Sequence, residues 1–578
     1  MKKKYLSLLA ACSFLFAGCS DFLDMNPNGI LDEESVSGVE QLDKLVISAY
    51  SMLGNDHYDI PFNLWPYGNV RSDDAYKGGR DESDIQDFHF YETSSNITAN
   101  FGEPDGLWYN CYIAISRANN ALRSLNNVSE QDFPNKKIRI GECRFIRGHF
   151  YFLLKVLFKS IPYIDETVAI EDYGTISNIA LSNDELWQKI ADDFKAAYDN
   201  LPESQGTDVG RANKYSAAAY LAKTYLYKAY RQDEKHNVTE INAEDLKQVL
   251  TFSNEVMSSD YGLEDDFAYN FLPGSYENGK ESLFAIQHST DDGTLYGRLN
   301  FSDALNVPMK FSGSCDFQKP SQNLVNAYKT VNGLPEFSDY NKADYNANTD
   351  KVDPRLYHTV ALPGVPYKYD KKNIFDESWT RNKAVYGLYS SLKENVALND
   401  PSSVLIDPFR ANTKNKIVIR YADVVLMRAE ALIELDREKE ALPLINEIRE
   451  RAKKSTGLID YAENVDIALY VDNVNCNWTK PYAREALRWE RRLELAMESQ
   501  RFFDLVRWGI ADSVINTFYK EEAPKRTYYE DAHFEKNRAE YVPIPQQQIN
   551  FSKQVYKQNY GYYCLLYTSP SPRDYAAS

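Results

Sequence analysis

The chain has 578 residues and a formal net charge of −19 at neutral pH. This length allows several domains or one large helical body. An acidic surface repels phosphate backbones, so the charge argues against nucleic acid as a partner. Aromatic residues are abundant, with 43 Tyr, 28 Phe and 7 Trp. Tyrosine joins an apolar ring to a polar hydroxyl, which suits sugar-binding surfaces as well as helix packing.

Residues 1–18 have the pattern of an export signal. A basic start is followed by an apolar run at 6–16 that is too short to cross a bilayer. Residues 15–19, Leu-Phe-Ala-Gly-Cys, resemble a bacterial lipobox, in which the cysteine receives the lipid. We therefore expect cleavage before Cys19 and anchoring of its thiol by acyl chains. Plain secretion with an incidental cysteine is the alternative.

Helical periodicity dominates residues 19–260, which we take as an N-terminal helical region. Ser182 and Glu185 form a capping box, which indicates the start of a helix. Apolar residues recur at steps of three and four in the stretches 39–53, 111–125, 146–157, 186–197, 217–226 and 246–257. This spacing predicts a series of helices that each bury one face.

Residues 261–410 differ from their surroundings, because Gly, Pro, Asn and Asp are frequent and the apolar runs are short. They predict a loop-rich insertion that carries short strands and is a candidate ligand-binding region. Helical spacing returns in residues 411–563, where a tight turn at 436–438 separates two helices. The expected fold is mainly α-helical, with tetratricopeptide-like helix pairs as its scaffold.

Residues 564–578 differ in character from the rest of the chain, and we interpret them as a non-native read-through tail. The cysteines that remain at 111, 143, 315 and 476 are widely spaced and form no CxxC pair. Their spacing predicts buried free thiols and no metal site. The seven histidines form no metal-ligand motif, and no cofactor is predicted.

Several segments resemble the SusD/RagB family of outer-membrane nutrient-binding lipoproteins. They occur in the family's order and together span residues 19 to about 563. They are Cys-Ser-Asp-Phe-Leu-Asp at 19–24, Asn-Pro-Asn-Gly at 26–29, and the segments 144–152, 419–432, 490–498 and 501–508. The closing segments 542–545 and 558–562 are also similar, although the family usually has Pro where Tyr560 stands.

The resemblance implies a helical fold of tetratricopeptide-like pairs and a protein that captures nutrients without chemistry. It also implies a partner, a SusC-type TonB-dependent transporter over which the lipoprotein sits as a lid. The family's cargo is most often a glycan and sometimes a peptide. We therefore predict a lipid-anchored protein on the outer face of the outer membrane that passes an oligosaccharide to such a transporter.

Charged residues are dense in the segments 420–430 and 490–494. This density could suggest catalysis, but arginine–carboxylate networks that hold helices together are the favoured interpretation. We predict no catalytic residues.

Two loop regions concentrate aromatic rings beside amide, acid and arginine side chains, which is the composition that a sugar ring needs. The best candidates for ligand binding are Trp65, Tyr67, Arg71, Asp73, Tyr76, Tyr296, Arg298 and Trp379. The alternative is that these rings pack the loops or face the transporter. Three other functions stay open: a peptide- or other nutrient-binding member of the family, a surface glycoside hydrolase, and a helical-repeat adaptor without a ligand.

Overall fold

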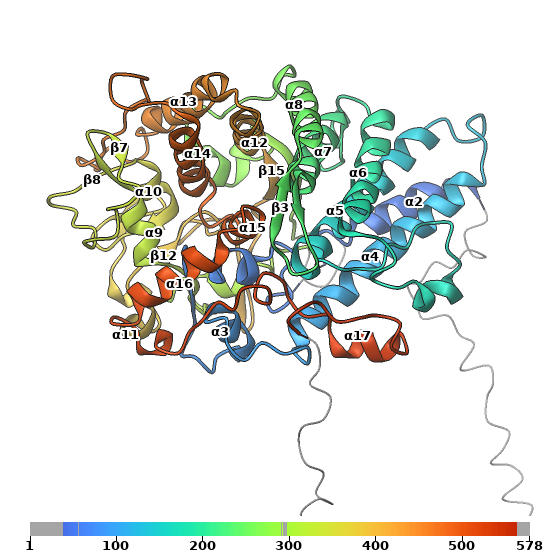
Figure 1. The fold of residues 1–578 in the computed structure, drawn as a ribbon, viewed down its shortest axis with the longest axis horizontal. Coiled ribbons are helices and arrows are strands. Elements are labelled where there is room, and N and C mark those ends of the chain that lie inside the picture. The colour runs from blue at the N-terminus through green and yellow to red at the C-terminus, as the bar shows by residue number, and fades with distance from the viewer. Residues whose placement is uncertain (1–37, 56, 291, 293–297, 563–578) are drawn as a thin grey trace, which may run out of the picture.

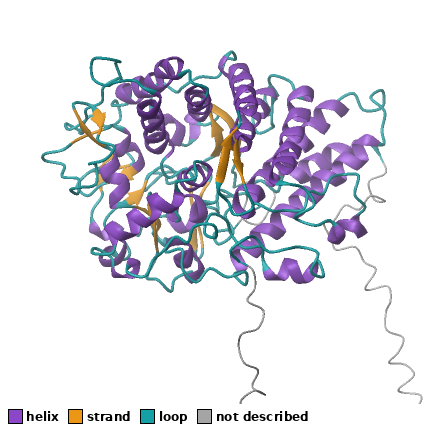
Figure 2. Ribbon diagram, viewed as in Figure 1, coloured by secondary structure: helices purple, strands orange, loops and turns teal. Residues whose placement is uncertain are grey.

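The computed structural model describes residues 38–562, except for 56, 291 and 293–297 (Figure 1). Helices make up most of the regular structure, and the strands are short and scattered between them (Figure 2). The prediction of a mainly α-helical fold with a loop-rich insertion is confirmed. The predicted export signal, with Cys19, and the segment 564–578 lie outside the described residues.

The N-terminal region is a row of antiparallel helices on the right of Figure 1, in which each long helix packs on its neighbour in the chain. Ser182 and Glu185 form the predicted capping box, and Asn213 and Ser216 form a second one. The helices and strands are α2 (Val39–Tyr50), η2 (Pro66–Val70), β1 (Ala75–Gly78), α3 (Gln86–Glu92), α4 (Gly102–Asn126), α5 (Lys136–Phe158), η3 (Ile170–Thr175), α6 (Asn183–Asn200), α7 (Lys214–Ala229), β2 (Tyr230–Gln232), β3 (Val238–Ile241) and α8 (Ala243–Met257).

The C-terminal region adds a second group of helices. The predicted turn at 436–438 separates α12 from α13, and these form the expected helix pair. The elements are β15 (Lys416–Arg420), α12 (Tyr421–Glu434), α13 (Glu438–Lys454), α14 (Lys480–Leu495), α15 (Arg501–Arg507), α16 (Ala511–Glu522), η8 (Thr527–Tyr529) and α17 (Gln546–Phe551). Because α12 packs against α7 and α8, one hydrophobic core joins the two helical regions. The region boundaries at 260/261 and 410/411 stay predictions.

The insertion is irregular and lies mainly on the left of Figure 1. Its elements are η4 (Phe267–Phe271), η5 (Gly274–Tyr276), β4 (Ser282–Ile286), η6 (Ala304–Asn306), β5 (Phe317–Pro320), α9 (Gln322–Ala327), β6 (Lys329–Val331), β7 (Leu334–Pro335), β8 (Lys351–Val352), α10 (Arg355–Thr359), β9 (Val360–Ala361), β10 (Pro366–Tyr367), β11 (Asp370–Ile374), η7 (Glu377–Trp379), α11 (Lys383–Tyr386), β12 (Ser390–Ser391), β13 (Ser403–Ile406) and β14 (Phe409–Asn412).

Two antiparallel strand pairs attach the insertion to the helical regions. Strand β5 pairs with β1, and strand β4 pairs with β15, which leads directly into α12. In the second pair Ile417 lies opposite Ala285 and Arg420 lies opposite Ser282. The remaining pairs, β2–β3, β9–β12, β10–β11 and β13–β14, and the three-stranded β7–β6–β8, are local additions.

The charged segments form buried ion-pair networks, as the sequence predicted. Glu494 on α14 accepts hydrogen bonds from Arg420 at 2.6 Å and Arg355 at 2.9 Å, and it is also paired with Arg451. Arg491 pairs with Asp423 on α12 at 2.9 Å. The partners lie on different elements and not one turn apart on a single helix. The networks therefore connect α12, α13, α14 and the insertion.

The four cysteines of the described chain differ in burial. Cys111 and Cys143 are buried free thiols, as predicted, whereas Cys315 and Cys476 are half-buried. Burial raises the pKa of Cys111 and Cys143, which makes both thiols unreactive. Within the described part of the chain, no helix is both long and apolar enough to cross a membrane.

Candidate functional site

The first predicted ligand-binding segment is buried. Trp65 is 1% exposed and donates its indole N–H to the carbonyl oxygen of Ser302 at 2.9 Å. Tyr67 is also 1% exposed, and its ring meets that of Tyr91 edge to face with centroids 5.1 Å apart. Neither ring presents a face on which a sugar could stack. The segment instead joins the N-terminal region to the insertion.

Arg71, Asp73 and Tyr76 from the same segment are buried as well. Arg71 donates to the carbonyl oxygen of Ala539 at 2.6 Å and lies over the ring of Phe502. Burial disfavours the ionised form of Asp73, but Arg492 and Arg501 outweigh it and lower the pKa of this carboxyl to about 2.

Tyr76 donates its hydroxyl to Glu522 at 2.8 Å. The ring is also covered by the Arg526 guanidinium, 3.9 Å from its centroid. Like Arg71 and Asp73, Tyr76 holds separate segments of the chain together. Its role in ligand binding stays a prediction, and the burial of the whole segment counts against it.

The residues of the second predicted region differ in burial. Trp379 is 1% exposed and belongs to a small core of the insertion, where its ring centroid lies 4.6 Å from that of Tyr367. Tyr296 lies outside the described residues. Arg298 donates to the Oδ1 of Asn55 at 3.0 Å, and it is the one predicted residue among those described whose side chain is partly exposed.

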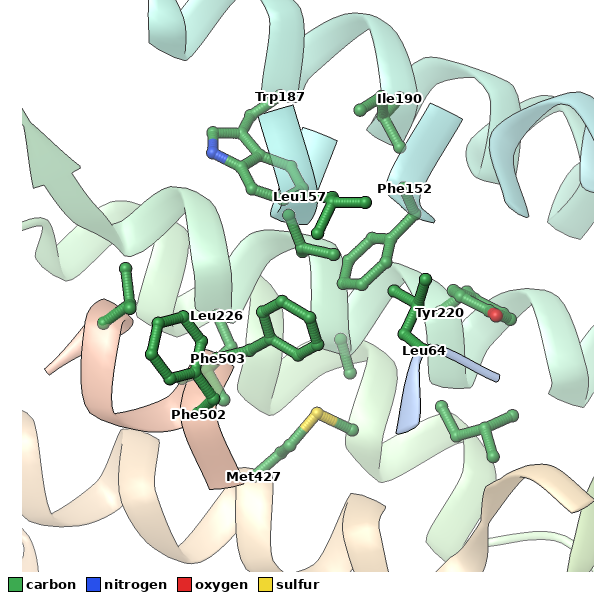
Figure 3. Packing of buried hydrophobic residues seen from close by; sticks show 14 of the residues in the cluster. Leu64, Phe152, Leu157, Trp187, Ile190, Tyr220, Leu226, Met427, Phe502 and Phe503 are labelled. Carbon is green, nitrogen blue, oxygen red and sulfur yellow. The ribbon is translucent and has the colours of Figure 1, made fainter. Parts of the chain in front are cut away.

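A cavity of about 120 Å³ lies where the two helical regions and the insertion meet. By volume it holds several water molecules. Leu64, Phe152 on α5, Tyr220 on α7 and Phe503 on α15 form much of its apolar wall. Figure 3 shows these four side chains coming together from four separate segments. None of the buried predicted residues lines this cavity.

The polar wall of the cavity carries four lysines, Lys223, Lys393, Lys414 and Lys416, against two glutamates, Glu394 and Glu498. Glu498 pairs with Lys393 at 2.6 Å and with Arg420 at 2.9 Å. Burial disfavours ionisation of Glu498, but the neighbouring cations outweigh it and keep its pKa below the usual value.

Glu394 accepts hydrogen bonds from Ser391 at 2.6 Å and Gln318 at 2.8 Å. Both cavity carboxylates are thus held by structural partners. This arrangement suits binding, and it offers no free pair of carboxyl groups for hydrolysis of a glycosidic bond.

Histidines contribute to the same wall without a charge. The Nδ1 of His149 shares a hydrogen bond with the hydroxyl of Tyr220 at 2.6 Å, and the Nδ1–H of His288 donates to the carbonyl oxygen of Arg298 at 3.0 Å. Burial lowers the pKa of His149 to about 3 and that of His288 to about 4. Among the described residues, no group of His, Cys, Asp and Glu is arranged to hold a metal ion.

Beside the cavity lies a partly exposed group of rings, the Tyr58 cluster, which consists of His57, Tyr58, Phe301 and Phe409. The centroids of Tyr58 and Phe409 are 4.4 Å apart, and those of His57 and Tyr58 are 4.0 Å apart. Phe301 stands between Asn300 and Ser302, which both line the cavity. The cluster is therefore joined to the cavity wall through the chain, although none of its four rings lines the cavity.

A second pair of partly exposed rings is linked to the cavity through Asn415. The centroids of Tyr269 and Tyr276 are 4.7 Å apart, and Tyr276 is 40% exposed. Asn415 lines both the cavity and the small pocket that contains Tyr276. The Asn415 amide donates to Gln287 at 2.7 Å, which places fixed amide groups beside the rings.

Sequence reasoning missed the Tyr58 cluster and the lysines of the cavity. Residues 55–60, Asn-Asp-His-Tyr-Asp-Ile, place aromatic rings beside amide and acid side chains, as in a sugar-binding site. This composition could have indicated the Tyr58 cluster. Lys414 and Lys416 are two residues apart, so in an extended chain they point to the same side. No local pattern indicated that this side faces a cavity.

Two family models match the chain. The model described as the SusD family matches residues 280–562, and the model described as starch-binding associating with outer membrane matches residues 21–226. The chain belongs to the SusD/RagB family. A relative in this family, SusD-like protein P2 of Formosa agariphila, is 25% identical over 574 residues, which are 97% of this chain and 100% of the relative.

Solved structures of SusD-like proteins share the fold. A laminarin binding SusD-like protein superposes with a TM-score of 0.65 at 21% identity, covering 91% of this chain and 100% of its own. Surface glycan-binding protein A from Bacteroides thetaiotaomicron, in complex with laminarihexaose, gives a TM-score of 0.61 at 18% identity, covering 90% and 100%. At these identities the likeness shows a common fold.

Proposed function

We propose that this protein captures an oligosaccharide at the cell surface and passes it to a SusC-type TonB-dependent transporter. The observation that carries the proposal is the Tyr58 cluster, a partly exposed group of rings in which Phe301 lies between two residues of the cavity wall. The SusD-like proteins of similar fold that bind laminarin or hold laminarihexaose support a glycan as the ligand.

The energetics of such a site suit capture and release. A sugar presents an apolar C–H face that can cover an aromatic ring, and burying roughly 100 Å² of apolar surface contributes at most about 2.5 kcal/mol. Millimolar binding requires about 4 kcal/mol. Two rings and a few hydrogen bonds from groups such as Arg298 and Asn415 are therefore enough for weak binding, which allows the cargo to move on.

The anchor and the partner are part of the same proposal. The lipobox ending at Cys19 would attach the protein to the outer membrane, and the outer-membrane description of the matching N-terminal family model supports this location. A peptide or another nutrient is the second candidate ligand, because the cavity combines apolar and charged walls. We propose no catalysis, since Glu394 and Glu498 are both occupied by structural partners.

Calorimetric titration of the mature chain with Cys19→Ser against neutral glycans, acidic glycans and peptides tests the proposal. Tyr58→Ala should weaken binding of the preferred glycan about tenfold, because one stacking ring is lost. Tyr109→Ala is the matched control, since this tyrosine is 59% exposed on α4 and lines no part of the cavity.

Reducing sugar released during the titration would show a glycoside hydrolase instead. Binding of peptides alone would favour the second candidate. A glycan that binds equally well to the Tyr58→Ala variant would refute the placement of the site at the Tyr58 cluster.

A further inference from the structure

Lys414 is a buried cation without a partner. Its side chain lines the cavity and the residue is 4% exposed. Within the described part of the chain, the Nζ of Lys414 makes no hydrogen bond and has no carboxylate at ion-pair distance. An ammonium group in such a place is costly, because it has lost water without gaining a direct ion pair.

Each of the other three cavity lysines has a carboxylate partner. Lys223 lies 3.3 Å from Asp423, Lys393 lies 2.6 Å from Glu498, and Lys416 lies 3.0 Å from Asp303. Each of these pairs connects two segments that are far apart in the sequence. The ammonium group of Lys414 forms no such pair within the described chain, so its charge does not hold two segments together.

A second unpartnered polar group lies in the same wall. Asn300 is 1% exposed and lines the cavity, and its amide nitrogen donates to Asp303 at 2.8 Å. This bond fixes the orientation of the amide, and Asn300 Oδ1 is left buried without a donor among the described residues. Buried acceptors are normally satisfied, so Asn300 Oδ1 offers a position for a hydroxyl group.

We propose that the cavity binds a carboxylate-bearing sugar, with Lys414 as the counter-charge of the carboxylate and Asn300 as an acceptor for a hydroxyl. The inference rests on the proposed glycan-binding function and adds the chemical class of the glycan. A uronic acid offers an anion, several hydroxyl groups and an apolar ring face. These match the unpaired lysine, the unpaired amide oxygen and rings such as Phe152 and Phe271 in the wall.

The pH dependence of binding gives an independent readout. Burial and the nearby Lys416 lower the pKa of Lys414 to about 8, and Asp303, Glu394 and Glu277 act in the opposite direction. Lys393, on another part of the wall, also has its pKa lowered to about 8 by burial, but Glu498 remains beside it. Affinity for an acidic sugar should be constant between pH 6 and pH 7 and fall as Lys414 loses its proton above about pH 8.

The experiment compares oligosaccharides of glucuronic or galacturonic acid with neutral oligosaccharides of glucose or galactose of the same length. Calorimetry on the mature chain with Cys19→Ser should show at least tenfold tighter binding of one acidic series, because a charge-assisted hydrogen bond is involved. Lys414→Met should remove that preference. Its thermal midpoint should be unchanged or higher, since an unpaired buried charge has been removed.

Lys159→Met is the matched control. Lys159 is also buried, its pKa is also lowered to about 8 by burial, and it bonds the carbonyl oxygen of Asp233 without lining the cavity. This variant should keep the preference for acidic sugars. If Lys159→Met and Lys414→Met lose it equally, the effect is general and the proposal is overturned.

The two proposals fail in different ways. Binding of a neutral glycan that is lost in Tyr58→Ala but unchanged in Lys414→Met would refute the acidic-sugar site and leave glycan capture intact. Binding of peptides alone, or of no glycan of either series, would overturn glycan capture and with it the acidic-sugar site.

Discussion

The Glu494 network gives the sharpest prediction about stability. Glu494 is fully buried on α14, and its two carboxylate oxygens accept from Arg355, Arg420 and Arg451. The substitution Glu494→Gln keeps the shape but removes the charge, which leaves three buried guanidinium groups around a neutral amide. A bond to a charged partner contributes about 1.5–3 kcal/mol, and breaking a buried pair typically costs about 3–5 kcal/mol.

We expect Glu494→Gln to lower the free energy of unfolding by about 3–5 kcal/mol, measured as a shift of the urea midpoint at constant slope by tryptophan fluorescence. Glu440→Gln is the control, because Glu440 makes a similar contact with Arg437 at the solvent-exposed start of α13. The control should leave the midpoint nearly unchanged. A loss below about 1 kcal/mol in Glu494→Gln would refute the claim that this network holds α13, α14 and the insertion together.

Two further predictions concern acid stability and packing. Burial opposes ionisation of Asp423, but Lys223 and Arg491 outweigh it and lower its pKa to about 2. Its contribution to stability is therefore complete above about pH 5 and is lost as the pH falls toward 2. Asp423→Asn should therefore lose about 2 kcal/mol at neutral pH and show a shallower fall of stability between pH 5 and pH 2 in urea titrations. Gly68→Ala should lose about 1–3 kcal/mol in the same assay, because a Cβ at this position would lie 2.2 Å from the backbone oxygen of Ser499. Gly174→Ala, where a Cβ meets nothing within 4 Å, should be neutral, and equal effects of the two alanines would contradict the packing argument.

The parts of the fold that depend on local sequence were predictable. The capping box at Ser182 needs only residues 182–185, and the turn at 436–438 needs only its neighbours. The resemblance to the SusD/RagB family, which the two family models confirm, rested on motifs of up to fourteen residues. In these places the signal in the sequence and the contacts in the structure involve the same residues.

The site was not predictable in the same way, because burial of a ring depends on segments far away in the chain. Trp65 is covered by residues near 302 and 317, and Trp379 by residues near 311 and 367. In the sequence both look like exposed loop aromatics beside polar groups. Tyr58 has a similar local composition but remains partly exposed, and only the three-dimensional packing separates these cases.

The charge of the whole protein and the charge of the cavity act over different ranges. A net charge of −19 opposes the approach of a polyanion as a whole, and this argues against long acidic polymers. At physiological ionic strength, however, exposed charges more than about 8 Å apart are largely screened. A carboxylate inside the cavity would interact mainly with Lys414 and its immediate neighbours. The acidic exterior and an acidic sugar as ligand are therefore compatible, and raising the salt concentration should weaken binding to the buried lysine less than it weakens contacts on the surface.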